Sequence, residues 1–135
     1  MALFANGWGS EYDPYRSNLG VYVASSKVNT LCLSPGLRLL IWDFEGYFGK
    51  KVVMNSGYRT PWHNDAVNGA RDSYHMKCMA ADFHIPGVSK QKLIAYAMRN
   101  GRVGGLGCYP GRKFIHVDVR SRPRGYNGPV TFSGC

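Results

Sequence analysis

The segment KFIHVDVR, residues 113–120, has the most regular pattern in the chain and constrains the fold most strongly. Aliphatic residues alternate in it with aromatic or polar ones: Ile115, Val117 and Val119 against Phe114, His116 and Asp118. This period of two predicts a β-strand, whose successive side chains point to opposite faces. The aliphatic face is expected to meet a hydrophobic core, which leaves His116 and Asp118 together on the other face. A half-exposed strand with a polar outer face would give the same pattern.

Further strands are predicted at residues 21–25, 51–57, 79–85 and 104–110. The last of these is expected to form a hairpin with residues 113–120, because Pro110-Gly111 between them is a typical turn sequence. Residues 58–78 form a polar loop far longer than most connections, and such loops are commonly functional.

Apolar residues at helical spacing predict two helices. The first follows Ser34-Pro35, because serine is a favoured N-cap and proline a favoured first helical residue, and it ends at Gly49. The second spans residues 90–100 and begins after Ser89. Four residues make up its expected buried face: Leu93, Ile94, Ala97 and Met98.

The order of these elements predicts one α+β domain over residues 1–135, with a small, mainly antiparallel sheet and helices on one side. Residues 1–30 are expected to form a mostly irregular N-terminal arm, and residues 121–135 an irregular tail.

The formal net charge of +9, from 17 Lys and Arg against 8 Asp and Glu, favours an acidic partner. Nucleic acid, an anionic cell-wall polymer and a membrane surface all fit, and solubility alone would explain the charge equally well. No apolar run is long enough to cross a bilayer. The N-terminal segment lacks the basic and apolar regions of a signal peptide. We therefore expect a chain made in the cytosol, or one whose targeting segment has been removed.

Four cysteines, at positions 32, 78, 108 and 135, lack the CxxC spacing of zinc fingers. The favoured interpretation is free thiols in a reducing compartment, and one or two disulfides are the alternative.

Candidate metal ligands occur in three separate segments. His75 lies in the long loop, Asp82 follows small residues in the predicted strand 79–85, and His116 lies in the last predicted strand. Two histidines and one aspartate suit Zn²⁺ and leave a position for water or substrate. Four histidines and several aspartates offer many such triples, so spacing alone indicates this site weakly. His84, on the same predicted strand face as Asp82, is a further candidate.

The order of the motifs is more specific than any single spacing. The chain contains SGYR at 56–59, SYH at 73–75, AAD at 80–82 and IHVD at 115–118, with Asn64 and Gly69 in the loop between. Over about residues 33–120, this pattern resembles the M15 peptidases, a group of zinc D-Ala-D-Ala carboxypeptidases and L-alanyl-D-glutamate endopeptidases. The small phage-type members are the most similar.

The resemblance implies a hedgehog/D-Ala-D-Ala-peptidase-like fold, with His75, Asp82 and His116 as ligands of Zn²⁺. It also implies that Arg59 lies near the metal, where its guanidinium could hold a substrate carboxylate or carbonyl. Ser73 and Tyr109 are further substrate-binding candidates.

One position departs from the family pattern. Several branches have a catalytic Glu or Asp three residues before the last histidine ligand, where this chain has Lys113. Asp118 is then expected to act as the base, and orienting a ligand or an arginine is its alternative role. His63 and His84 are the remaining titratable candidates.

The expected function is hydrolysis of a peptidoglycan stem-peptide bond by metal-activated water, as in an endolysin-like endopeptidase or a D,D-carboxypeptidase. Such an enzyme would act on the bacterial cell wall after release, without a stable protein partner or membrane insertion. The alternatives are a non-catalytic zinc-binding module of the same fold and a nucleic-acid-binding protein, the less favoured of the two. The second alternative would use a basic, aromatic cluster near the C-terminus: Arg112, Lys113, Arg120, Arg122, Arg124 and Tyr126.

Overall fold

The computed structural model describes residues 21–25, 27–30, 32–60, 64, 66–67 and 73–135. Most of the expected N-terminal arm, together with His63 and Gly69, lies outside these residues. Among the helices of the described part, none has the length and apolar character needed to cross a membrane.

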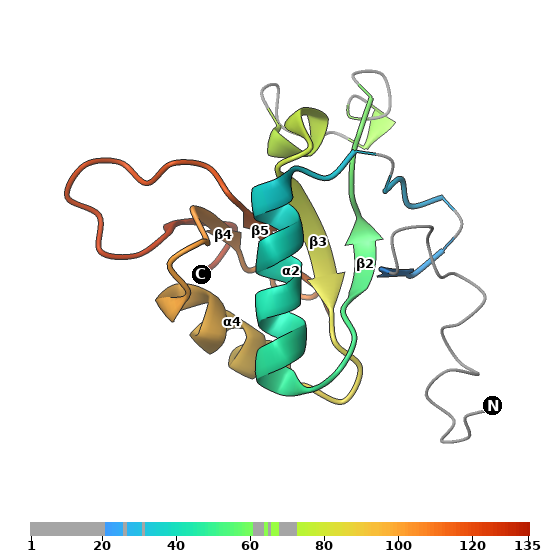
Figure 1. Ribbon diagram of the computed structural model, residues 1–135, viewed down its shortest axis with the longest axis horizontal. Coiled ribbons are helices and arrows are strands. Elements are labelled where there is room, and N and C mark those ends of the chain that lie inside the picture. The colour runs from blue at the N-terminus through green and yellow to red at the C-terminus, as the bar shows by residue number, and fades with distance from the viewer. Residues whose placement is uncertain (1–20, 26, 31, 61–63, 65, 68–72) are drawn as a thin grey trace.

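A six-stranded sheet forms the centre of the domain (Figure 1). Its strands, in chain order, are β1 Tyr22–Val23, β2 Val53–Ser56, β3 Ala80–His84, β4 Gly105–Gly107, β5 Ile115–Asp118 and β6 Val130–Phe132. Their order across the sheet is β1-β2-β3-β5-β4-β6. The central pairs β2/β3, β3/β5 and β5/β4 are antiparallel, whereas the edge pairs β1/β2 and β4/β6 are parallel. The predicted α+β class, mainly antiparallel sheet and hairpin are confirmed.

The first predicted helix is α2, Pro35–Phe48. The Ser34 hydroxyl accepts a hydrogen bond from the backbone N–H of Leu37 at 3.3 Å, as an N-cap does. Gly49 ends the helix with φ 66°, a left-handed conformation that favours glycine, and its N–H donates to the carbonyl of Glu45. Both predicted ends are therefore confirmed.

The second helix, α4, spans Lys90–Arg99 and begins at the Ser89 N-cap. Leu93 and Ala97 are fully buried and Ile94 packs against the core, but Met98 is 45% exposed. The prediction for Met98 is wrong because neighbouring helical residues are about 100° apart around the axis. Ala97 is fully buried in the core, so the next residue, Met98, is turned away from it.

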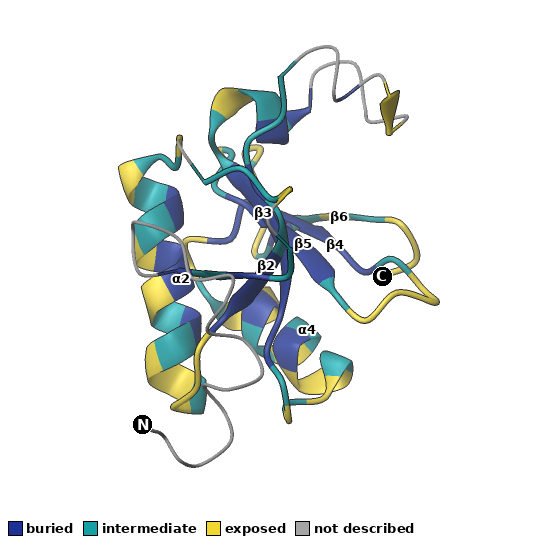
Figure 2. Ribbon diagram, turned by 90° about the vertical axis from the view of Figure 1, so that its right-hand side faces the viewer, coloured by how far each residue is buried: buried dark blue, intermediate teal, exposed yellow. Residues whose placement is uncertain are grey.

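Both helices pack on one face of the sheet, and their outward sides are exposed (Figure 2). The core on this face joins apolar residues of the helices and strands: Leu37, Leu40, Ile41 and Phe44 with Phe83, Leu106, Ile115 and Val117. The ring centroids of Phe44 and Phe83 are 4.9 Å apart in an edge-to-face contact. The opposite face of β3 and β5 is thus left to polar side chains.

The tail contains a strand that the sequence did not predict. β6 pairs in parallel with β4, with Gly107 opposite Phe132. The expectation of an irregular tail over residues 121–135 is therefore wrong at residues 130–132. A three-residue strand carries too little alternation to be recognised in the sequence, and its partner lies more than twenty residues away.

Two disulfides, Cys32–Cys78 and Cys108–Cys135, correct the favoured interpretation of free thiols. Their Cα atoms are 5.3 and 5.0 Å apart, within the range that a disulfide bridges. Sequence separations of 46 and 27 residues give no local sign of pairing, because only the fold brings these cysteines together.

Replacement of both Cys32 and Cys78 by alanine is expected to lower the free energy of unfolding by about 3–4 kcal/mol, because the bond closes a long loop of the unfolded chain. Denaturant unfolding of the variant and of the parent protein would measure this loss. Reductant should shift the parent midpoint further than the variant midpoint. Equal unfolding midpoints for the variant and the parent would contradict the presence of the Cys32–Cys78 disulfide.

Candidate metal centre

Three side chains converge on the polar face of the sheet. Asp82 of β3 and His116 of β5 are direct cross-strand partners. His75 reaches them from η2, the short 3-10 helix Tyr74–Lys77. The carboxylate Oδ1 of Asp82 lies 3.1 Å from His75 Nε2 and 3.0 Å from His116 Nδ1. One potential ligand atom from each residue lies within 4.8 Å of the others, and all three residues are buried.

The second nitrogen of each histidine is held by an acceptor outside this group. His75 Nδ1 lies 2.7 Å from the carbonyl oxygen of Gly57, which can only accept, so Nδ1 is the donor of that contact and Nε2 faces Asp82. His116 Nε2 lies 2.7 Å from Asp118 Oδ2, and its Nδ1 faces Asp82. Metal-binding histidines are commonly fixed in this way by a carbonyl or carboxylate.

Gly57 must remain a glycine for this arrangement. A Cβ atom built there would lie 2.3 Å from the carbonyl oxygen of Asn29. The glycine of the SGYR segment therefore lets the backbone approach closely enough to present its carbonyl to His75.

Asp82 is held in its ionised form. Burial alone would raise the pKa of its carboxyl, but hydrogen bonds with His116 and His75 outweigh burial and keep that pKa below its ordinary value. An ionised carboxylate beside two imidazole nitrogens is a donor set that a divalent cation can use.

Asp118 is fully buried behind His116 and does not line the cavity described below. The Arg120 guanidinium donates to both carboxylate oxygens, from Nε to Oδ1 at 2.8 Å and from Nη2 to Oδ2 at 2.7 Å. Burial would raise the pKa of Asp118, but the hydrogen bonds with His116 and Arg120 lower it to about 2. Both oxygens are thus engaged with His116 or Arg120.

Arg59 lies on the other side of Asp82. Its Nη2 is 3.5 Å from Asp82 Oδ2, while Nε donates to Ser56 Oγ at 3.3 Å and Nη1 to Asn64 Oδ1 at 3.2 Å. Three partners fix the guanidinium plane. Arg59, predicted to lie near the metal, is therefore placed beside the Asp82 carboxylate.

An open cavity of about 890 Å³ lies over these groups, and Asp82 is the one carboxylate among its described lining residues. Asp118 and His84 are not part of the lining, which includes six other candidate site residues: Arg59, Ser73, His75, Asp82, Tyr109 and His116. The Ser73 hydroxyl also accepts from the backbone N–H of His75 at 3.2 Å, so it supports the loop that carries this histidine. Burial raises the pKa of Tyr109, which keeps its phenol protonated as a donor.

His84 shares a strand face with Asp82 but does not join the site. Its Nδ1 lies 2.7 Å from Asn55 Oδ1 and it does not line the cavity. Burial and the charge of Lys113 lower the pKa of His84 to about 4, so its imidazole is neutral.

Sequence reasoning did not assign Arg120 or Phe132 to this site. Arg120 follows Asp118 by two positions, and strand alternation would have put both on one face. Phe132 of β6 contacts His116, with ring centroids 5.1 Å apart, and no sequence signal links these residues.

The family model for Peptidase M15 matches residues 21–118, which include His75, Asp82 and His116. Among curated proteins, the chain is 36% identical over 94 residues to Peptidoglycan L,D-endopeptidase MepK of Escherichia coli K12, covering 64% of this chain and 51% of that protein. It is 51% identical over 97 residues to Probable peptidoglycan L,D-endopeptidase MepK of Haemophilus influenzae, covering 64% and 50%. The chain spans about half the length of these relatives. By this match, which extends over most of its length, the chain belongs to the peptidase M15 family.

Proposed function

We propose that this chain is a zinc-dependent peptidase that hydrolyses a bond in the stem peptides of peptidoglycan. The convergence of His75, Asp82 and His116 beneath an open cavity, in a chain of the M15 family, carries the proposal. The names of the curated relatives favour an endopeptidase over a D,D-carboxypeptidase.

The donor set fits zinc. Two imidazole nitrogens and one carboxylate oxygen are ligands typical of catalytic zinc sites, and three protein ligands leave a coordination position open. The carbonyl of Gly57 and the carboxylate of Asp118 fix the two histidines from behind. Bound zinc would supply a water of lowered pKa and a Lewis acid for the peptide carbonyl.

Arg59 and Tyr109 are proposed to hold the substrate. The Arg59 guanidinium, fixed by Ser56 and Asn64, can bind a substrate carbonyl or carboxylate beside Asp82. The protonated phenol of Tyr109 can donate a hydrogen bond within the same cavity.

Asp118 is proposed to position His116 rather than to act as the base. Its two oxygens accept hydrogen bonds from His116 and Arg120, and its side chain has no exposed surface from which to take a proton. This favours the orienting role that the sequence left as the alternative.

Two further observations support a peptidase of the cell wall. Disulfides persist in oxidising surroundings such as the outside of the cell, where peptidoglycan lies. Part of the basic cluster that suggested a nucleic-acid interface is already engaged, since Arg120 binds Asp118 and Arg122 donates to the carbonyls of Val103 and Asn100.

Arg59→Gln is expected to lower kcat/KM for a stem peptide by about ten- to a hundredfold, because charge-assisted hydrogen bonds contribute about 1.5–3 kcal/mol. Zinc content should stay near that of the parent protein. Arg124→Gln, an exposed arginine outside the cavity, is the matched control and should keep parent kinetics. Parent kinetics in Arg59→Gln would show that Arg59 does not hold the substrate.

The proposal is tested by digestion of purified peptidoglycan with the protein as prepared, after chelation, and after zinc is returned. Soluble fragments are expected in the first and third samples and should be absent in the second. Equal digestion in all three, with the metal shown to be removed, would refute zinc dependence.

A further inference from the structure

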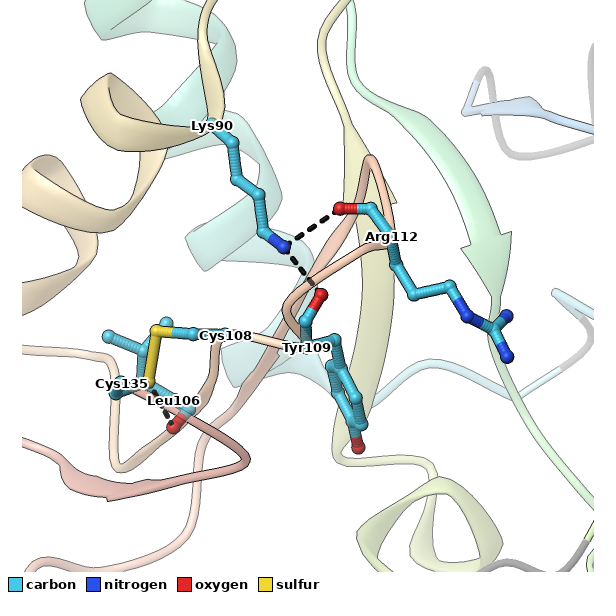
Figure 3. The surroundings of a disulfide bond; sticks show 6 residues. All are labelled: Lys90, Leu106, Cys108, Tyr109, Arg112 and Cys135. Carbon is cyan, nitrogen blue, oxygen red and sulfur yellow. Dashed lines mark hydrogen bonds between the residues drawn. A yellow bond between two sulfur atoms is a disulfide. The ribbon is translucent and has the colours of Figure 1, made fainter.

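A rigid turn carries two side chains to the rim of the cavity. This rim turn, residues 109–112, joins β4 to β5, and the N–H of Arg112 donates to the carbonyl of Tyr109 at 3.0 Å. Lys90, the first residue of α4, donates from Nζ to the carbonyls of Tyr109 at 2.6 Å and Arg112 at 2.8 Å. Figure 3 shows the Tyr109 and Arg112 side chains extending away from this ammonium group.

The C-terminal segment holds the same turn from another side. The Cys108–Cys135 disulfide joins the residue before the turn to the end of the described chain (Figure 3). The N–H of Tyr109 also donates to the carbonyl of Ser133 at 2.8 Å. The backbone of the rim turn is thus fixed by α4 and by the segment that follows β6.

Arg112 differs from the other two arginines that line the cavity. Arg59 pairs with Asp82 and Arg120 with Asp118. Within the described part of the chain, no carboxylate lies within ion-pair distance of Arg112. Its guanidinium lies over the Phe114 ring, 5.9 Å from the centroid, and is otherwise exposed.

Arg112 also lies where two hollows meet. A second hollow of about 280 Å³ shares Arg59, Asp82, Arg112 and Phe114 with the main cavity. Its lining adds Lys27, and Asp82 is its one carboxylate among the described residues. A ligand that crosses Asp82 from one hollow to the other therefore passes Arg112, and the described lining residues of the two hollows carry a net positive charge.

We infer that Arg112 recognises a carboxylate of the substrate close to the bond that is cut, and that Lys90 and the Cys108–Cys135 disulfide position it. A guanidinium matches a carboxylate with two parallel hydrogen bonds. The preferred substrates are then stem peptides with free carboxylates, and peptides with amidated carboxylates are disfavoured. The inference rests on the proposed function for the identity of the substrate.

The test measures binding apart from cleavage. A stem tetrapeptide with free carboxylates and its amidated counterpart are titrated calorimetrically into chelator-treated protein. The parent protein is expected to bind the free form about tenfold more tightly. This gain in affinity lies between the contributions of buried and of exposed charged pairs. Arg112→Gln should abolish the preference, Arg112→Lys should keep part of it, and the control Arg124→Gln should keep all of it.

Lys90→Met tests the positioning. This variant keeps Arg112 but removes both hydrogen bonds to the rim turn, so the preference should fall while the thermal midpoint stays close to that of the parent. Lys92→Met is the matched control, because Lys92 lies two residues further along α4 and is exposed. If Lys90→Met keeps the full preference for the peptide with free carboxylates, Lys90 does not position Arg112.

Equal or unmeasurable binding of the two peptides by the parent, or an unchanged preference in Arg112→Gln, would overturn the inference. A cleavage assay of both peptides with zinc-loaded protein distinguishes failure of the recognition role of Arg112 from failure of the proposed peptidase activity. Equal cleavage of both forms sinks the recognition role alone. A preference that depends on Arg112, in a protein that cuts neither peptide, sinks the proposed peptidase activity alone.

Discussion

His116→Ala is expected to remove bound zinc and to lower stem-peptide cleavage by about a thousandfold or more, because activation of water requires the metal. His116 supplies one of the three proposed ligand atoms, and its Nδ1 lies 3.0 Å from Asp82 Oδ1. The measurements are zinc content by atomic spectroscopy and the rate of cleavage of a purified stem peptide. Far-ultraviolet circular dichroism would show that the sheet remains folded.

His84→Ala is the matched control for this variant. It removes an imidazole from the same sheet face, but one that hydrogen-bonds to Asn55 and does not line the cavity. Parent zinc content and cleavage are expected. Full activity in zinc-free His116→Ala would refute the proposed site, whereas loss of zinc in His84→Ala would show that the ligand set is wrong.

Asp118→Asn is expected to weaken zinc binding by about ten- to a hundredfold, the usual cost of losing a residue that orients a metal-binding histidine. The amide can no longer offer a carboxylate to both His116 and Arg120. If Asp118 only positions His116, saturating zinc should restore much of kcat. If Asp118 is the base, kcat should stay low at any zinc concentration while zinc affinity is unchanged.

Asp43→Asn is the control for this charge change. Asp43 also accepts from an arginine, Arg102 at 2.9 Å, but it lies on the helical side of the molecule, where Arg102 is exposed and Asp43 is partly exposed. Zinc affinity and kcat should be unchanged, and the free energy of unfolding should fall by less than about 1 kcal/mol. Comparison of the two variants isolates what Asp118 does for His116.

Local signals predicted the parts of the fold that depend on neighbouring residues. Ser34 and Gly49 fixed both ends of α2, because an N-cap and a left-handed C-cap are set by the residues beside them. Alternation in residues 115–118 likewise predicted the two faces of β5. The prediction that Met98 is buried failed because a residue beside the buried face of a helix is covered only where another element packs on it, which no local pattern records.

Features set by long-range contacts were not predictable in the same way. β6 exists because it pairs with β4, and the disulfides exist because the fold brings distant cysteines together. The site falls between these cases. Ordered motifs indicated His75, Asp82 and His116, but the cross-strand register of Asp82 with His116 and the engagement of Asp118 by Arg120 came from the assembled sheet.

Mass spectrometry of stem peptides after digestion of peptidoglycan tests the central claim most directly. Zinc-loaded protein is expected to yield fragments that together exceed the mass of the parent peptide by one water, with cleavage at a single peptide bond. Chelated protein should yield none of these fragments, and added zinc should restore them. The absence of a cut peptide bond with zinc-loaded protein, or the same cut by metal-free protein, would contradict the account.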